Sequence, residues 1–255
     1  MSKYSGAFSG LVFFIVIWQL LVTLMGVPKW LMPAPTDVLG SLIKDHRLIL
    51  SHSAYTLVAA LTGFGLAIIG GTFLALIMDF WPALRSRIYP LLILSQTIPI
   101  ITVAPLIIIW LGYGLLPKVM VVALVCFFPV TISIIGGMQA ADDDLVDLLK
   151  MMGVSKWQVI KLARLPASFP SFFSGLRISA TYCVMAAVIG EWLGSSNGLG
   201  VILTRATHSY QMGRVFAAIT AIVVLSLIIF FMVEVMARLI MPWQYRGQNK
   251  TGIRN

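Results

Sequence analysis

Residues 144–166 read DLVDLLKMMGVSKWQVIKLARLP, a charged and amphipathic segment inside an otherwise strongly apolar chain. Of the 255 residues, 59% are hydrophobic and only 11% are charged. A soluble domain of this length usually has about a quarter of its residues charged. The composition therefore indicates a membrane protein in which this segment lies outside the bilayer.

The apolar runs on both sides of the segment are long enough to cross a membrane. A helix needs about 20 residues to cross a hydrocarbon layer about 30 Å thick. One or two buried helices of a soluble fold would not account for so many runs of this length. We therefore predict an all-α membrane protein with a single transmembrane domain over residues 1–255 and six transmembrane helices near residues 8–26, 55–80, 88–112, 118–138, 172–194 and 215–241.

The distribution of basic residues predicts the orientation. The chain has 18 Lys and Arg against 9 Asp and Glu, and in membrane proteins basic residues collect in cytoplasmic segments. Nucleic acid is therefore not an expected partner. With both termini in the cytoplasm, eleven of the 18 basic residues lie inside and six outside, and Arg177 lies in the fifth span. We expect a multi-pass protein of the cell membrane with both termini cytoplasmic and residues 139–170 as its longest inner loop.

This inner loop has the pattern of two short helices joined by a turn. Its first half carries an apolar stripe at helical spacing, formed by Leu145, Leu148, Leu149 and Met152. The acidic run 142–144 suits a helix N-terminus, Gly153 suits a C-cap or tight turn, and Ser155 can cap a second helix. We expect Leu165 and Pro166 to end the second helix before the fifth span.

Two kinds of partner suit such a segment. An amphipathic helix with several Lys and Arg can bind anionic lipid at the membrane surface. A helix with an apolar stripe can instead fit a groove on another protein. Periodicity alone slightly favours membrane lipid, whereas the pattern of a known family favours a protein.

The segment resembles the cytoplasmic loop of the permeases of ATP-binding-cassette importers. The family pattern is Glu-Ala-Ala, three residues, Gly, nine residues, Ile, any residue, Leu-Pro. Here Asp147-Leu148-Leu149 takes the place of the opening triplet, and Gly153 and Leu165-Pro166 match at the required spacing. The triplet matches only in its acidic residue, and Ala163 stands where the pattern has Ile.

Other stretches extend this resemblance over most of the chain. They are similar to the branch that carries sulfonates, taurine, nitrate and vitamin precursors, and they read WLMPAPTDVLGSL (30–42), SQTIPIITVAPLIIIWLGYG (95–114), SGLRIS (174–179) and GEWLGSSNGLG (190–200). The resemblance implies a type I importer fold with two permease chains (here two copies of this chain, a homodimer), a dimer of cytoplasmic ATPases and an extracellular or periplasmic solute-binding protein. No Walker motif occurs in the sequence, so we expect neither an enzyme nor a bound cofactor.

In this family the Gly-containing loop forms the coupling helix, which inserts into a cleft on the ATPase. The resemblance thus implies a set of ATPase-coupling residues, namely Asp147, Leu148, Leu149, Gly153, Lys156, Leu165 and Pro166. A short rigid helix tied to the fourth and fifth spans would convert closure of the ATPases into movement of the spans.

Polar residues within the spans are candidates for the translocation pathway, because polar groups that face lipid are costly. The third span holds Ser95, Gln96 and Thr97, followed by Pro99 and Pro105, which free backbone carbonyls that need a protein or water-lined environment. The alternative is a kinked packing helix whose Ser and Thr bond back to their own turn. Because lipid supplies no partner for Gln96, we favour a pathway role.

Two charged residues of the fifth span are further candidates for a gate. Glu191, near the outer end, is either an interfacial anchor beside Trp192 or part of an external gate or binding-protein contact, where it could orient Arg205 or His208. Arg177, near the inner end, either extends to lipid headgroups or pairs with a carboxylate of the other chain or of an inner gate.

Local spacing gives three structural expectations. Glu234 and Arg238 are four residues apart and should form a helical ion pair. Asp79 should end the second span beside Arg85. Small residues in this span allow close helix packing at Gly63, Gly65, Gly70 and Gly71.

Two other classes of function compete with the importer. A secondary transporter or channel not coupled to ATP would show inverted repeats or paired charges at the midplane. An intramembrane enzyme or metal site would need a constellation of polar residues in the spans, but the three His lie in outer loops or at a span edge, and Cys126 and Cys183 look like packing residues. We therefore expect an importer of a small organic anion or heterocycle, and the Trp- and Met-rich composition favours a vitamin precursor.

Overall fold

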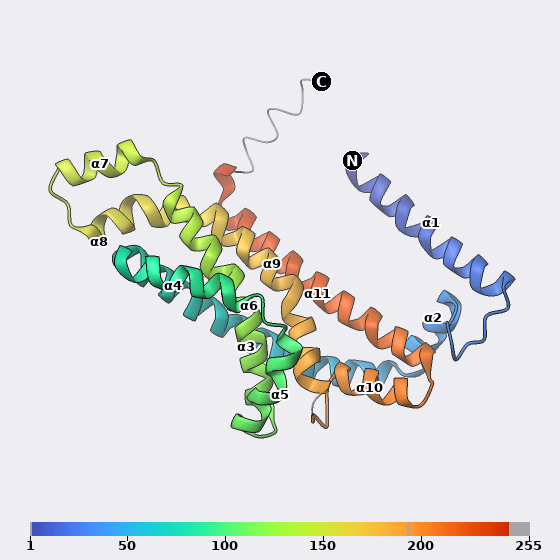
Figure 1. Ribbon diagram of the computed structural model, residues 1–255. Coiled ribbons are helices and arrows are strands. Elements are labelled where there is room, and N and C mark those ends of the chain that lie inside the picture. The colour runs from blue at the N-terminus through green and yellow to red at the C-terminus, as the bar shows by residue number, and fades with distance from the viewer. Residues whose placement is uncertain (1, 193, 245–255) are drawn as a thin grey trace.

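The computed structural model describes residues 2–192 and 194–244. Every regular element in these residues is a helix, as predicted (Figure 1). The elements are α1 (Ser2–Leu24), α2 (Pro35–Lys44), α3 (His46–Phe80), α4 (Pro82–Ser95), α5 (Ile100–Leu111), α6 (Leu115–Gln139), α7 (Asp143–Met151), α8 (Lys156–Val159), the π-helical turn η1 (Ile160–Arg164), α9 (Leu165–Trp192), α10 (Leu199–His208) and α11 (Met212–Ile240).

Within the described residues, four helices are long and apolar enough to cross a membrane. They are α3, α6, the continuous run Lys156–Trp192 that contains α9, and α11. The pair α4 and α5 passes the same test together and gives a fifth span if the bent pair is counted as one. The apolar part of α1, Ser9–Leu24, is shorter than a span of this kind, so the sixth span stays a prediction.

The expected single helix at residues 88–112 is wrong. The chain bends by 102° between α4 and α5, because α4 ends at Ser95 and α5 begins at Ile100. Pro99 explains the position of the break, since it has no N–H group and disfavours helical geometry at Ile98. Pro105 lies within α5 and does not interrupt it.

The core of the bundle is the packing of α6 against α3 on one side and α9 on the other, with α11 against α9. Glycine explains the close approach of α3 and α6. A Cβ atom at Gly63 would lie 2.5 Å from Val122 Cβ, and one at Gly71 would lie 2.9 Å from Thr131 Oγ1. The predicted close packing is thus confirmed at these two positions, whereas Gly65 faces open space.

Two regions extend from this bundle in opposite directions. Helices α7 and α8 form a hairpin that projects beyond the ends of α6 and α9 (Figure 1). Helix α1 lies beside α11 on the other side of the molecule, and its Trp18 ring stacks at 5.5 Å from the ring of Phe216. Both cysteines, Cys126 and Cys183, are buried and free, as expected for packing residues.

Candidate functional site

The hairpin of residues 142–164 is built by strong local signals. Asp142 caps α7, since its Oδ1 accepts a hydrogen bond from Asp144 N at 3.0 Å. Gly153 forms the turn with φ +77°, a left-handed conformation that favours glycine. Ser155 then caps α8 in a capping box, in which Ser155 N donates to Gln158 Oε1 at 2.7 Å and Gln158 N donates to Ser155 Oγ at 3.4 Å. The predicted turn and caps are confirmed.

The second half of the hairpin does not end at Leu165 and Pro166. The helix runs on from Lys156 through η1 into α9, as one run of 37 residues that ends at Trp192. The π turn accounts for this difference. Leu165 N donates to Ile160 O, five residues earlier, so the hydrogen-bond register shifts just before Pro166, which has no N–H to contribute. The hairpin is therefore joined to a membrane span without a break.

The two halves of the hairpin are held together by a small apolar cluster. Val146 of α7 is buried against Val159 and Ala163, with Leu149 and Val154 partly buried beside them. The opposite face is open. Its exposed apolar side chains range from 44% to 86% exposed and are Leu145, Leu148, Met151, Met152, Trp157 and Leu162. The predicted stripe is thus divided, with Leu149 facing inward and the others outward.

The seven predicted coupling residues lie in and directly after this hairpin. Asp147 forms an exposed ion pair with Lys150 at 2.7 Å. Lys156 lines a cavity at the base of the hairpin. Leu165 is partly buried against the main core, where α9 begins.

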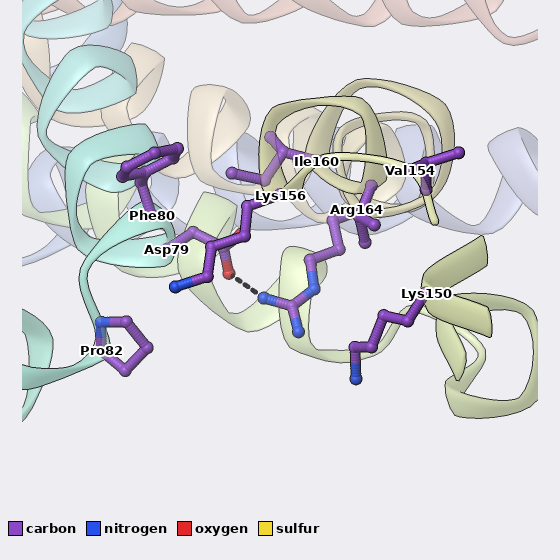
Figure 2. Close-up of a pocket in the computed structure, with 9 residues that line it drawn as sticks. Asp79, Phe80, Pro82, Lys150, Val154, Lys156, Ile160 and Arg164 are labelled. Atoms are coloured by element: carbon purple, nitrogen blue, oxygen red, sulfur yellow. Dashed lines mark hydrogen bonds and ion pairs between the residues drawn. The ribbon is translucent and has the colours of Figure 1, made fainter. Parts of the chain in front are cut away.

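Asp79 ties the end of α3 to the hairpin. Its Oδ1 accepts a hydrogen bond from Arg164 Nη1 at 2.8 Å, and its side chain is only 4% exposed. The expectation that Asp79 ends its span is confirmed, since α3 ends at Phe80, but its ion pair is with Arg164 rather than with the nearby Arg85. The true partner lies 85 residues away in sequence, which no local spacing indicates. Figure 2 shows this ion pair in a cavity of about 270 Å³.

The polar residues of the third predicted span lie at the break between α4 and α5. Ser95 Oγ donates to Leu92 O and Thr97 Oγ1 donates to Leu94 O, both at 2.7 Å. These bonds are those of the alternative interpretation, in which the hydroxyls bond back to their own turn. Gln96 and Pro99 are exposed in the single chain, so they lie on the surface of the bend.

Arg177 is held by α11 of the same chain. Its Nε donates to Glu234 Oε2 at 2.8 Å, and Arg238 Nε donates to Glu234 Oε1 at 2.9 Å. The helical pair of Glu234 and Arg238 is confirmed. Of the expected alternatives, Arg177 thus pairs with a carboxylate, and in the single chain that carboxylate is Glu234. The arrangement links the middle of α9 to the last third of α11.

Glu191 is buried at 1% exposure, so the interpretation as an interfacial anchor is wrong. Its Oε1 accepts from Thr56 Oγ1 and its Oε2 accepts from Gly200 N, both at 2.8 Å. Thr56 Oγ1 in turn accepts from Leu199 N at 2.9 Å. The carboxylate is therefore engaged with α3 and with the turn that follows α9, rather than with Arg205 or His208.

The turn of residues 194–200, in the part that the structure describes, is held by the same network. Gly198 has φ +125°, and a Cβ atom there would lie 2.1 Å from Glu191 Cδ. Gly198 N donates to His52 Nδ1 at 2.9 Å, and Lys118 Nζ donates to Ser195 Oγ at 2.6 Å. Three helices, α3, α6 and α9, thus hold this turn. No sequence signal identified His52 or Thr56 as its supports.

An all-helical bundle of apolar spans, with a broken span and a hairpin that projects from the membrane region, is the architecture of a membrane transport component. Residues 63–242 match the family model described as the binding-protein-dependent transport system inner membrane component. The chain belongs to this family of multi-pass ABC transporter permeases, in which the ATPase is a separate subunit.

Individual relatives cover nearly the whole chain. A "Probable ABC transporter permease protein" of Haemophilus influenzae is 34% identical and covers 86% of this chain and 90% of its own. The "Formylaminopyrimidine transport permease protein ThiX" of Halalkalibacterium halodurans is 33% identical, with 90% and 92% covered. The "Riboflavin transport system permease protein RibX" of Chloroflexus aurantiacus is 31% identical, with 92% and 88% covered.

A solved structure supports the fold. A chain of the "MetNI methionine ABC transporter" in inward-facing conformations aligns with a TM-score of 0.57 and 17% identity, over 76% of this chain and 94% of the other. The resemblance to importer permeases of the sulfonate, taurine and vitamin-precursor branch is thus confirmed.

Proposed function

We propose that this chain is the transmembrane subunit of an ATP-driven type I importer and that the hairpin of residues 142–164 is its coupling element. The observation that carries the proposal is the open apolar face of the hairpin on a rigid continuation of α9. Met151 is 86% exposed, Met152 69% and Leu148 54%. Contiguous exposed apolar side chains outside a membrane mark a protein contact, and a short helix with such a face suits a groove on a soluble partner.

The charges of the hairpin favour an ATPase over a lipid surface as the partner of this face. Asp142, which caps α7, and Asp143, Asp144 and Asp147 within α7 are all exposed. An anionic membrane surface would repel the acidic first turns of α7. A protein groove can offer apolar contacts and complementary basic groups together, so the coupling surface is best assigned to the ATPase.

The unbroken helix gives this contact a mechanical consequence. Because α8, η1 and α9 form one run, a displacement of the hairpin is passed directly to a membrane span. The ion pair between Asp79 and Arg164 passes the same displacement to the junction of α3 and α4. ATP-driven closure of the ATPases would thus move at least two spans together.

The pathway is assigned to the bend between α4 and α5 in a dimer of two copies. Broken helices in transporters place free backbone groups and polar side chains at the substrate route. Gln96 and Pro99 are exposed in the single chain, so they are available to a pathway or to a second copy. In this arrangement both termini lie in the cytoplasm. Glu191 and the fixed turn of residues 194–200 then form a rigid outer surface, which suits contact with a solute-binding protein.

The transported solute is proposed to be a small heterocycle or organic anion. Relatives named for formylaminopyrimidine and riboflavin transport support a vitamin precursor, and more distant relatives named for aliphatic sulfonates and taurine support an organic anion.

The test uses two substitutions at Gly153. Proline cannot adopt φ +77°, whereas asparagine tolerates the left-handed region. We expect the tagged Gly153→Pro chain to insert but to lose its co-purifying ATPase and ATP-driven uptake in proteoliposomes. The matched Gly153→Asn chain should retain both. Normal ATP-driven uptake by the proline variant would remove the coupling role, and uptake without any ATPase would favour a secondary transporter or channel.

A further inference from the structure

A second site lies at the base of the hairpin and shares no lining residue with the exposed apolar face. It is a cavity of about 270 Å³ between the end of α3 and the hairpin. Asp79, Phe80 and Pro82 form one wall. The hairpin supplies three basic residues, Lys150, Lys156 and Arg164. Figure 2 shows their cationic groups in one row, with Arg164 between the two lysines.

The cavity carries an excess of positive charge. Arg164 is paired with Asp79, and Lys150 is paired with Asp147 in an exposed ion pair that solvent screens. Lys156 forms no ion pair among the residues that the structure describes. Asp79 and Asp147 balance Arg164 and Lys150, so Lys156 leaves the cavity with one uncompensated positive charge, which an anion would balance.

The position of the cavity at the end of a candidate span points to a lipid as the source of that anion. α3 is long and apolar enough to cross a membrane and ends at Phe80, so Asp79 lies in the last turn of a candidate span. Trp81 follows directly and is 54% exposed, as is typical of side chains at the headgroup level. Basic pockets between spans at this level bind the headgroups of anionic lipids.

The second carboxylate oxygen of Asp79 indicates that the ligand also carries a hydrogen-bond donor. Asp79 Oδ2 is buried and has no hydrogen-bond partner. A buried acceptor without a partner is unfavourable, so a ligand with a hydroxyl group would be bound more tightly than one without. The cavity therefore offers lysine side chains that can bind a phosphate and, at Asp79 Oδ2, an acceptor for a hydroxyl group of the same ligand.

We propose that this cavity binds the phosphate-diester headgroup of an anionic phospholipid, with Lys150 and Lys156 contacting the phosphate and a headgroup hydroxyl donating to Asp79 Oδ2. The lipid would hold the base of the hairpin at the membrane surface while the apolar face stays free for the ATPase. The site does not depend on ATP coupling, so either assignment can fail without the other.

The experiment measures lipid retention by the full chain. The chain is purified in mild detergent with equal phosphatidylglycerol and phosphatidylcholine, and native mass spectrometry counts the lipids that stay bound. We expect phosphatidylglycerol to be retained in preference. Lys156→Gln should lower its apparent affinity about fivefold, the effect of removing one basic residue beside an anionic headgroup.

The matched control is Lys161→Gln, which removes the same charge from an exposed residue of the same helix that does not line the cavity. This variant should retain the lipid as the unmodified chain does. Equal losses in both variants, or equal retention of the two lipids, would overturn the proposal. Saturable binding of inorganic phosphate to lipid-free protein with the same dependence on Lys156 would replace the lipid with a soluble phosphate.

Discussion

The two turns built on glycine, one at Gly153 and one at Gly198, are stabilised in opposite ways. The turn at Gly153 is held by caps within its own segment, and the space beside Gly153 is open. The turn at Gly198 is held by buried polar groups from other helices, and the space beside Gly198 is filled by the Glu191 carboxylate. The turn at Gly153 is stabilised locally and has exposed apolar neighbours, so it is free to bind a partner. The turn at Gly198 is bonded to three helices, so it is suited to a rigid surface.

The largest expected effect on stability is that of alanine at Gly198, compared with alanine at Gly153. Gly198→Ala would place a Cβ atom 2.1 Å from Glu191 Cδ at a backbone with φ +125°. This steric conflict and backbone strain should together lower the free energy of unfolding by about 3 kcal/mol or more. Gly153→Ala meets nothing within 4 Å, so only the left-handed strain of about 1 kcal/mol applies.

The measurement is the thermal unfolding midpoint of both variants in the same detergent, with Gly65→Ala in the open part of α3 as the control. Equal losses of stability at Gly198 and Gly153 would contradict the contrast between a filled and an open turn.

The next largest effect on stability is expected from a substitution of the Glu191 carboxylate. Glu191→Gln keeps the shape of the side chain, and its amide oxygen can still accept from Gly200 N while its NH₂ group faces Thr56 Oγ1, whose hydroxyl can donate to His52 O instead. Two bonds to a carboxylate are replaced by weaker bonds to a neutral amide, and we expect destabilisation of about 1–2 kcal/mol. The corresponding change in the hairpin, Asp147→Asn, breaks an exposed ion pair and should change stability by less than about 1 kcal/mol.

Denaturation of the two variants side by side, under conditions where unfolding is reversible, checks this prediction. A loss at Asp147 as large as that at Glu191 would show that the hairpin pair is structurally important in the isolated chain.

The same contrast explains which features the sequence could predict. The Asp142 and Ser155 caps, the turn at Gly153 and the pair of Glu234 and Arg238 depend on residues within four positions of one another, so local rules identified them. The broken span was recognised as a proline-disturbed region, but periodicity could not show a bend of 102°. The continuation past Pro166 was missed because a π turn leaves no distinct residue pattern.

The missed contacts join distant parts of the chain. Arg164 lies 85 residues from Asp79, and Thr56 lies 135 residues from Glu191. Such pairs depend on which spans become neighbours, and a single sequence gives apolar length but not helix adjacency. The candidate coupling residues could be listed from the family pattern, yet the division of their stripe into a buried and an exposed face required the packing of α7 on α8 and η1.

The smallest expected effect concerns the ion pair between Asp45, which joins α2 and α3, and Arg214 at the start of α11. Asp45 accepts hydrogen bonds from Arg214 Nε at 2.8 Å and from Arg214 Nη2 at 3.0 Å. This hydrogen bonding holds the pKa of Asp45 below its usual value, against a smaller opposing effect of burial. A carboxyl whose pKa is lower in the folded state stabilises the fold at pH values above its unfolded pKa, and that contribution is lost as the pH falls through the folded pKa.

We therefore expect the unfolding midpoint to fall as the pH is lowered from about 5 toward 3, across the usual range of an aspartate. Because Arg214 is 32% exposed, the contribution should stay below about 1 kcal/mol. Asp45→Asn should reduce this pH dependence, whereas Asp147→Asn in the hairpin should leave it unchanged, since that pair is open to solvent on both sides. If both substitutions reduced the pH dependence equally, the exposed pair of Asp147 and Lys150 would contribute as much as the bidentate pair of Asp45 and Arg214. Burial would then not explain a difference between the two pairs.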